Sequence, residues 1–206
     1  MHPRPPALPI SNNARDSLRH ATASLHERVD ACMPLARPDA TLDDYHRHLA
    51  MLRAWVHGLR QLRPSLAPRL AQVAGALDAD LTQCRQILDQ PTPCYSAAPN
   101  PQSTRWTAPA QADDFDWGIA YVMEGSRLGG QVLYRRLCES LAPHRLDYLR
   151  GAGSLTGPRW KTFLAELGDA LDTPQRIQRA CDGAVMAFQL LLHCHAGGKT
   201  TAEATS

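Results

Sequence analysis

The sequence has no apolar run of membrane-spanning length, no C-x-x-C pair and no strand-like alternation of apolar and polar residues. A spanning helix needs about 20 consecutive apolar residues, so a membrane span is not expected. The six cysteines have no regular spacing, which predicts reduced thiols in a cytoplasmic protein rather than a disulfide framework. The 22 basic and 20 acidic residues are spread along the chain, so neither nucleic acid nor a membrane surface is an expected partner.

What is present is helical periodicity. The chain of 206 residues has the size of one domain and can bury about 70% of its unfolded surface without metal or disulfide support. Apolar residues recur at steps of three and four, which predicts an all-α fold, a single-domain helical bundle with six main helices. The expected helices lie near residues 11–33, 41–63, 66–88, 113–137, 159–171 and 174–192. We expect an extended arm over 1–10, a surface connector over 91–112, the domain over 11–195 and a disordered tail over 196–206.

One helical segment carries an unusual group of glycines. Residues 121–137, "YVMEGSRLGGQVLYRRL", contain Gly125, Gly129 and Gly130. Each glycine inside a helix costs about 1 kcal/mol relative to alanine, so packing or function must compensate. The segment's apolar stripe, which we expect to face the core, consists of Phe115, Ile119, Val122, Ser126, Gly129, Leu133 and Leu137. Its small central residues predict a hollow for a flat or bulky group, and tight helix packing through small residues is the alternative.

A histidine on the first helix could face such a hollow. His26 lies beside the apolar stripe of "LRHATASLHERVDAC", and Asp30 follows four residues later, within reach of one ring nitrogen. A carboxylate in that position fixes the imidazole tautomer and leaves the other nitrogen available to a metal. A satisfied core or boundary histidine is the alternative interpretation.

Two other kinds of metal site are not favoured. A di-iron carboxylate site needs paired Glu-x-x-His motifs on two helices, and this sequence has none. The remaining closely spaced histidines are His46 with His48 and the group from His193 to His195. A spacing of two on a helix points side chains apart, so we expect these histidines on the surface.

The segments "LRHATASLHERVDA" and "YVMEGSRLGGQVLYRRL" together resemble the heme oxygenase family, especially the bacterial type associated with bacteriophytochromes. The likeness extends to "TLDDYHRHLAML" and "TPQRIQRACDGAVMAFQLLL", between about Leu18 and Leu192. It implies a bundle in which heme lies between the first helix and a glycine-kinked distal helix.

The resemblance also implies roles for individual residues. His26 becomes the proximal ligand of the heme iron, with Asp30 beside its other nitrogen, and Gly125, Gly129 and Gly130 belong to the distal helix. Ser126 occupies a position at which the animal enzymes carry an aspartate that orders water. The remaining implied contacts are Phe188 at the heme edge and the candidate propionate-binding cations Arg19, Lys161, Arg176 and Arg179.

The implied reaction uses heme b as both cofactor and substrate. Oxygen and a reductant such as a ferredoxin or ascorbate open the ring to biliverdin, with release of CO and ferrous iron. The product would supply a bilin chromophore, with a bacteriophytochrome as receiver, or free iron. A heme- or bilin-binding carrier without turnover is the alternative function.

Overall fold

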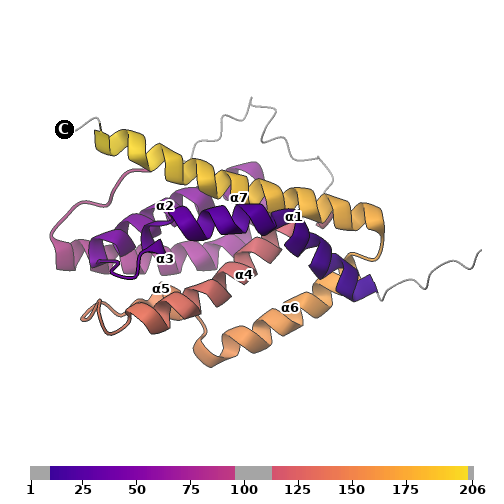
Figure 1. Ribbon diagram of the computed structural model, residues 1–206, viewed down its shortest axis with the longest axis horizontal. Helices are drawn as coiled ribbons and strands as arrows, with labels where there is room; N and C mark the ends of the chain where they lie inside the picture. Colours follow the sequence, from indigo (N-terminus) through magenta and orange to yellow (C-terminus); the bar gives the residue numbers. More distant parts are fainter. Residues whose placement is uncertain (1–9, 96–112, 204–206) are drawn as a thin grey trace, which may run out of the picture.

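The computed structural model describes residues 10–95 and 113–203 (Figure 1). The α-helices are α1 (Ile10–Cys32), α2 (Leu42–Leu62), α3 (Ala67–Leu88), α4 (Asp113–Leu137), α5 (Asp147–Arg150), α6 (Thr156–Ala170) and α7 (Pro174–Glu203). Short 3-10 turns are η1 (Pro34–Ala36), η2 (Pro64–Leu66) and η4 (Gly153–Leu155). The described residues contain no strand, so the all-α prediction is confirmed. Residues 1–9 of the arm expected over 1–10, and residues 96–112 of the connector expected over 91–112, lie outside the described residues, and Ile10 belongs to α1.

The boundaries of α2 and α4 follow from local chemistry. The hydroxyl of Thr41 accepts a hydrogen bond from the backbone of Asp44, whose carboxylate accepts one from the backbone of Thr41, so α2 begins with a capping box. At the start of α4, Asp116 does more than complement the helix dipole. Its carboxylate accepts hydrogen bonds from Arg63 at 2.7 Å and from Ser65 at 2.6 Å. These contacts attach the beginning of α4 to the end of α2.

The closest helix crossing is between α4 and α7, the two helices with the most extensive mutual packing. A Cβ atom on Gly118 would lie 1.8 Å from the carbonyl oxygen of Ala180, and one on Gly183 would lie 2.1 Å from that of Phe115. Only glycine permits this approach of the two backbones. The tight packing considered as an alternative for the glycines at 125 and 129 therefore occurs at Gly118, two to three turns earlier on α4.

Helix α7 continues through residues for which the sequence predicted a disordered tail. The helix ends at Glu203, so residues 196–203 are helical. The earlier prediction rested on the polar, glycine-containing sequence. Gly198 packs so closely on Tyr95 that a Cβ atom would lie 1.9 Å from the ring, and this tertiary contact supports the helix.

The prediction of surface positions for His46 and His48 is wrong. His46 is fully buried, and His48 is 9% exposed. A spacing of two residues does point the two rings in different directions. Both rings are nevertheless buried, because α2 packs on α3 and also on α7. His193 is exposed as expected, and His195 is half-buried.

Burial of His48 predicts a loss of stability in acid. Desolvation, with a smaller contribution from His195, lowers the pKa of His48 to about 4, against 6.5 in the unfolded chain. The unfolded state therefore binds more protons between these values, and stability falls as pH decreases from about 6.5 to 4. The loss approaches about 3 kcal/mol at 1.36 kcal/mol per pKa unit. Urea unfolding across this range measures it. A slope that His48→Gln leaves unchanged would contradict the assignment to His48.

A buried polar cluster positions the short helix α5 behind α4. The carboxylate of Asp80 accepts hydrogen bonds from the hydroxyl of Tyr45 at 2.6 Å and from the backbone N–H of Tyr148 at 2.9 Å. The neighbouring Leu149 packs on α4, with its carbonyl oxygen 3.5 Å from the Cβ position of Gly130. Gly130 is therefore the position at which α4 contacts α5, whereas Gly125 and Gly129 have other surroundings.

Candidate functional site

The apolar stripe of α4 is open at its centre. Val122 and Leu137 are buried as expected, but Ser126 and Gly129 between them are exposed. A Cβ atom on Gly129 would have nothing within 4 Å among the described residues. The sequence predicts that Ser126 and Gly129 lie on a buried face. Both are exposed because no element of the described part of the chain covers the centre of the stripe.

The direction in which one side of α4 faces follows from the helix geometry and from two contacts. At 3.6 residues per turn, five residues between Tyr121 and Arg136 fall within an arc of about 80°. These residues are Tyr121, Gly125, Gly129, Val132 and Arg136. Contacts of the first and the last of these residues, Tyr121 and Arg136, identify the neighbouring element that this side faces.

Both ends of this side face α1 or the turn that follows it. Burial raises the pKa of Tyr121, and the guanidinium groups of Arg15 and Arg19 on α1 oppose that rise. At the other end, Arg136 donates a hydrogen bond to the carbonyl of Leu35 in η1. The side that carries Gly125 and Gly129 is therefore directed toward α1.

Helices α1 and α4 run in the same direction and both pack on α7, yet the described residues of the two helices make almost no direct contact (Figure 1). His26 lies about midway along the chain between the contacts at Arg19 of α1 and Leu35 of η1. Gly129 lies about midway between Tyr121 and Arg136 on α4. The imidazole and the exposed glycine are therefore at the same level of two facing helices.

The surroundings of His26 suit a metal ligand. Its Nδ1 atom lies 2.9 Å from a carboxylate oxygen of Asp30, and the side chain is 63% exposed. With Nδ1 occupied, Nε2 is the nitrogen available to a ligand, and no hydrogen bond to it occurs within the described part of the chain. The ring of Phe188, on α7, lies 5.9 Å from the imidazole. The predicted residues His26, Asp30 and Phe188 are thus brought together.

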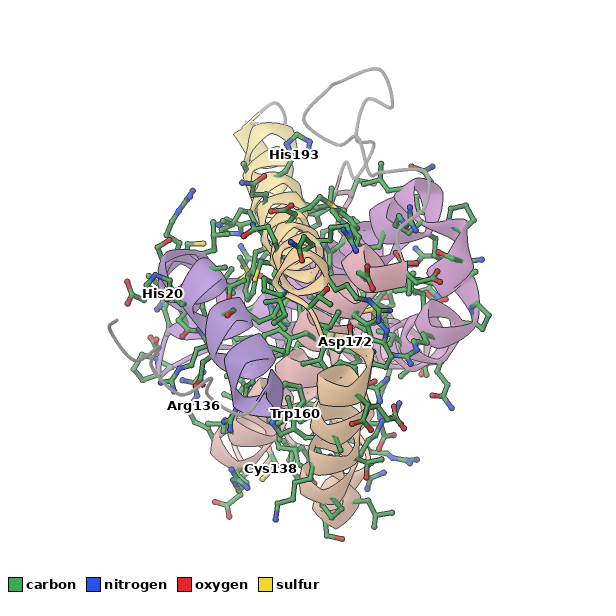
Figure 2. All side chains as sticks on the ribbon, turned by 90° about the vertical axis from the view of Figure 1, so that its right-hand side faces the viewer. His20, Arg136, Cys138, Trp160, Asp172 and His193 are labelled. Carbon is green, nitrogen blue, oxygen red and sulfur yellow. The ribbon has the colours of Figure 1, made fainter. Side chains whose placement is uncertain are left out.

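A side chain limits the space between α1 and α4 at each of its two ends. Trp160 of α6 approaches Gly125, with ring atoms 3.8 Å from its Cβ position, and α6 also packs on α1 (Figure 2). At the other end, the hydrogen bond from Arg136 to Leu35 joins the helices. The eleven steps from Gly125 to Arg136 rise about 16 Å along the helix axis. This length is comparable with that of a flat tetrapyrrole.

The predicted cations fall into two groups. Arg176 and Arg179 both donate hydrogen bonds to Asp114, at 2.9 Å and 2.7 Å, so their charges are already paired. Arg19 and Lys161 are exposed, on α1 and α6 respectively. The arrangement therefore favours the second group for binding carboxylates.

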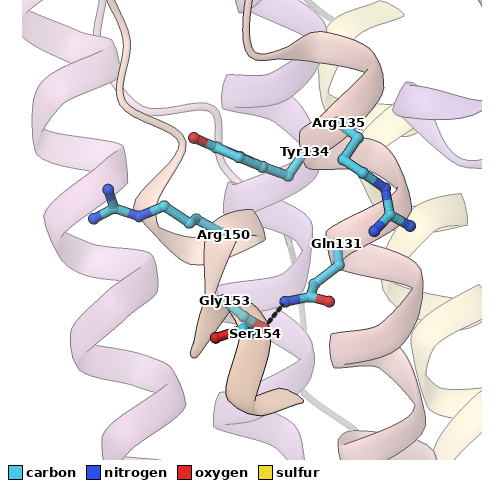
Figure 3. A pocket seen from close by; sticks show the side chains of 6 residues that line it. All are labelled: Gln131, Tyr134, Arg135, Arg150, Gly153 and Ser154. Atoms are coloured by element: carbon cyan, nitrogen blue, oxygen red, sulfur yellow. Dashed lines mark hydrogen bonds between the residues drawn. The ribbon is translucent and has the colours of Figure 1, made fainter. Parts of the chain in front are cut away.

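The side of α4 that faces away from α1 is held by contacts with η4 and α6. Glu124 pairs with Arg159 of α6 through two contacts of 3.2 Å. Farther along, Gln131 donates hydrogen bonds to Gly153 and Thr156. Gln131, Gly153 and Ser154 line part of a pocket of about 180 Å³ on this opposite side (Figure 3).

Sequence reasoning missed Tyr121, Trp160, Arg15 and Arg136. Tyr121 could have been found from its position one turn before Gly125. Trp160 belongs to another helix, and its approach to Gly125 depends on the packing of α6, for which the sequence holds no local signal. Arg15 and Arg136 have the appearance of ordinary exposed helix residues.

The fold and site define an all-α protein in which one imidazole faces the exposed backbone of a glycine-containing helix. A family model described as Heme oxygenase matches residues 12–194, and the chain belongs to that family. No curated protein matches the chain. Within the described residues, no helix is long and apolar enough to cross a membrane.

Proposed function

We propose that this member of the family opens heme to biliverdin, with release of CO and ferrous iron. The observation that carries the proposal is the open centre of α4 at the level of His26. Helix packing does not require Gly129, because its Cβ position faces open space, so the missing side chain leaves room for a ligand. Heme, when bound, supplies both the iron that activates oxygen and the porphyrin that is oxidised.

The residues on the α1 side bind and orient. His26 would hold the iron through Nε2, while Asp30 orients the imidazole through its contact with Nδ1. Phe188 contacts the imidazole from α7 and contributes an apolar wall. Arg19 and Lys161 pair with the propionates, and Arg15 joins them because it lies near Tyr121 at the same end.

The residues of α4 restrict the other face. The backbone at Gly125 and Gly129 would allow a bound ring to approach α4 closely, because neither residue has a side chain in the way. Ser126 donates its hydroxyl proton to the carbonyl of Met123 at 2.7 Å, so toward the site its oxygen can only accept a hydrogen bond. Ser126 therefore orients a water molecule as an acceptor, without the charge that an aspartate would bring.

The proposed location of the protein is the cytoplasm. A ferredoxin or ascorbate supplies electrons, and a bacteriophytochrome receives the biliverdin in the bacteriophytochrome-associated type. The thiols of Cys32, Cys84, Cys138, Cys181 and Cys194 are free, which suits a reducing compartment.

A titration with hemin tests the ligand assignment. His26→Ala should weaken hemin binding at least about tenfold, equivalent to about 1.4 kcal/mol, and should remove the absorption features of a histidine ligand. Asp30→Ala should retain ligation with an altered spectrum, since only the second hydrogen bond is lost. Identical spectra for wild type and His26→Ala would refute the assignment.

Reduction of the hemin complex separates enzyme from carrier. With ascorbate or a ferredoxin system and oxygen, an oxygenase loses its Soret band while a bilin spectrum grows. A stable reduced heme would instead identify a heme carrier and refute the proposed turnover.

A further inference from the structure

The aromatic side chain nearest to the distal glycines belongs to α6. Atoms Cη2 and Cζ3 of Trp160 lie 3.8 Å and 4.0 Å from the Cβ position of Gly125, and no other described residue comes within 4 Å of that position. The Tyr121 ring, one turn earlier on α4, lies 5.5 Å from the indole. Trp160 therefore limits the α1-facing side of α4 at Gly125.

Stacking holds this indole in place. The centroid of the Phe163 ring lies 5.7 Å from that of Trp160 at an angle of 22°, and the Trp117 ring of α4 lies 5.7 Å from Phe163. Arg69 covers Trp117 at 5.5 Å. Phe163 is buried, so the indole rests on a fixed partner rather than on solvent. Trp160 consequently presents a rigid edge to the site.

A ring held by one axial ligand still has a rotational freedom. The bond to His26 fixes the iron but not the rotation of the macrocycle about that bond. The glycine backbone on the other face offers no side chain that would stop the rotation. Pairing of the propionates with Arg19 and Lys161 limits this rotation only loosely, because both are long and exposed side chains. A rigid side chain at one end of the space between α1 and α4 would limit the rotation further.

The two ends differ in rigidity. Arg136 is an exposed, flexible side chain held by a hydrogen bond to a backbone carbonyl. Trp160 is half-buried and supported by the aromatic stack. We propose that Trp160 is a specificity-determining residue, which stops rotation of the bound heme and thereby selects the meso carbon that is attacked. This inference rests on the proposed function, because it concerns the same site.

The test uses Trp160→Phe and Trp160→Ala in the full chain. Phenylalanine preserves the stack on Phe163 but is too short to retain the atoms nearest Gly125. Trp117→Phe is the matched control, since it changes the same stack at a position that does not approach Gly125. One measurement is the heme methyl pattern in proton NMR of the ferric cyanide complex, which reports ring rotation without turnover. The other is chromatography of the biliverdin isomers after reduction with ascorbate.

For wild type and Trp117→Phe we expect one dominant methyl pattern and one dominant isomer. Both Trp160 variants should show a second methyl pattern and at least a fivefold rise in the minor isomers. Unchanged patterns in Trp160→Ala, or in Trp160→Phe if the alanine variant does not fold, would overturn the role of Trp160. Wild-type protein that ligates heme without opening it would refute the proposed function instead, and the methyl patterns would still decide the role of Trp160.

Discussion

Gly129→Leu is expected to stabilise the ligand-free protein while it removes heme turnover. Helix α4 gains about 0.5–1 kcal/mol when a glycine inside it is replaced by leucine, and the new side chain meets no described atom within 4 Å of its Cβ. The melting temperature should rise by about 2–4 °C per kcal/mol. The same side chain fills the space opposite His26, so hemin affinity should fall about 10- to 100-fold. Thermal unfolding and hemin titration measure the two effects.

Gly75→Leu provides the matched control. Gly75 lies inside α3, and its Cβ position also has nothing within 4 Å, so this substitution should give the same gain in stability. Hemin binding and turnover should remain at wild-type values. Normal turnover in Gly129→Leu would refute the proposed site, and equal losses in both variants would indicate a general effect of added apolar surface.

The helices were predictable because their signals are local. The capping box at Thr41 requires only a side chain and a backbone group three residues apart, and the structure contains it. The glycines of α4 were recognisable for the same reason, since any glycine weakens a helix wherever it lies. Element type and approximate bounds therefore follow from periodicity, caps and prolines.

The roles of individual glycines were not predictable, because they depend on the neighbouring helix. Gly118 and Gly129 belong to one helix, yet the first touches backbone of α7 and the second touches nothing. The sequence draws attention to Gly129 because it belongs to a group of three glycines within one helix, and it gives no prominence to Gly118. Only the positions of the neighbouring helices distinguish a packing glycine from one whose Cβ position is open.

The same limit explains the misplaced polar residues. His46 and His48 are buried because α2 has helices on two sides, which no pattern within α2 indicates. Arg176 and Arg179 are paired because Asp114, more than sixty residues earlier, begins the helix that crosses α7. The partner of Arg176 and Arg179 therefore depends on how α4 crosses α7, which no pattern within α7 indicates.

Gly118→Ala is expected to have the largest effect on stability. The new Cβ atom would lie 1.8 Å from the carbonyl oxygen of Ala180 and 2.7 Å from the nitrogen of Ala184. Both atoms are backbone, so no side chain can rotate away and the helices must separate. We expect a loss of about 3 kcal/mol or more, despite the gain of about 1 kcal/mol in helix propensity. Urea unfolding measures it, and Gly75→Ala should be stabilising by the same propensity.

Gly183→Ala should be similarly damaging, since its Cβ atom would lie 2.1 Å from the carbonyl oxygen of Phe115. Because both glycines serve one crossing of α4 with α7, a single separation of the helices relieves both clashes. The double variant should therefore lose at least about 1 kcal/mol less than the sum of the single losses. That separation also moves α4, with Gly125 and Gly129, away from Phe188 on α7. Any folded single variant should consequently bind hemin more weakly, and wild-type affinity in such a variant would show that the crossing does not set the site.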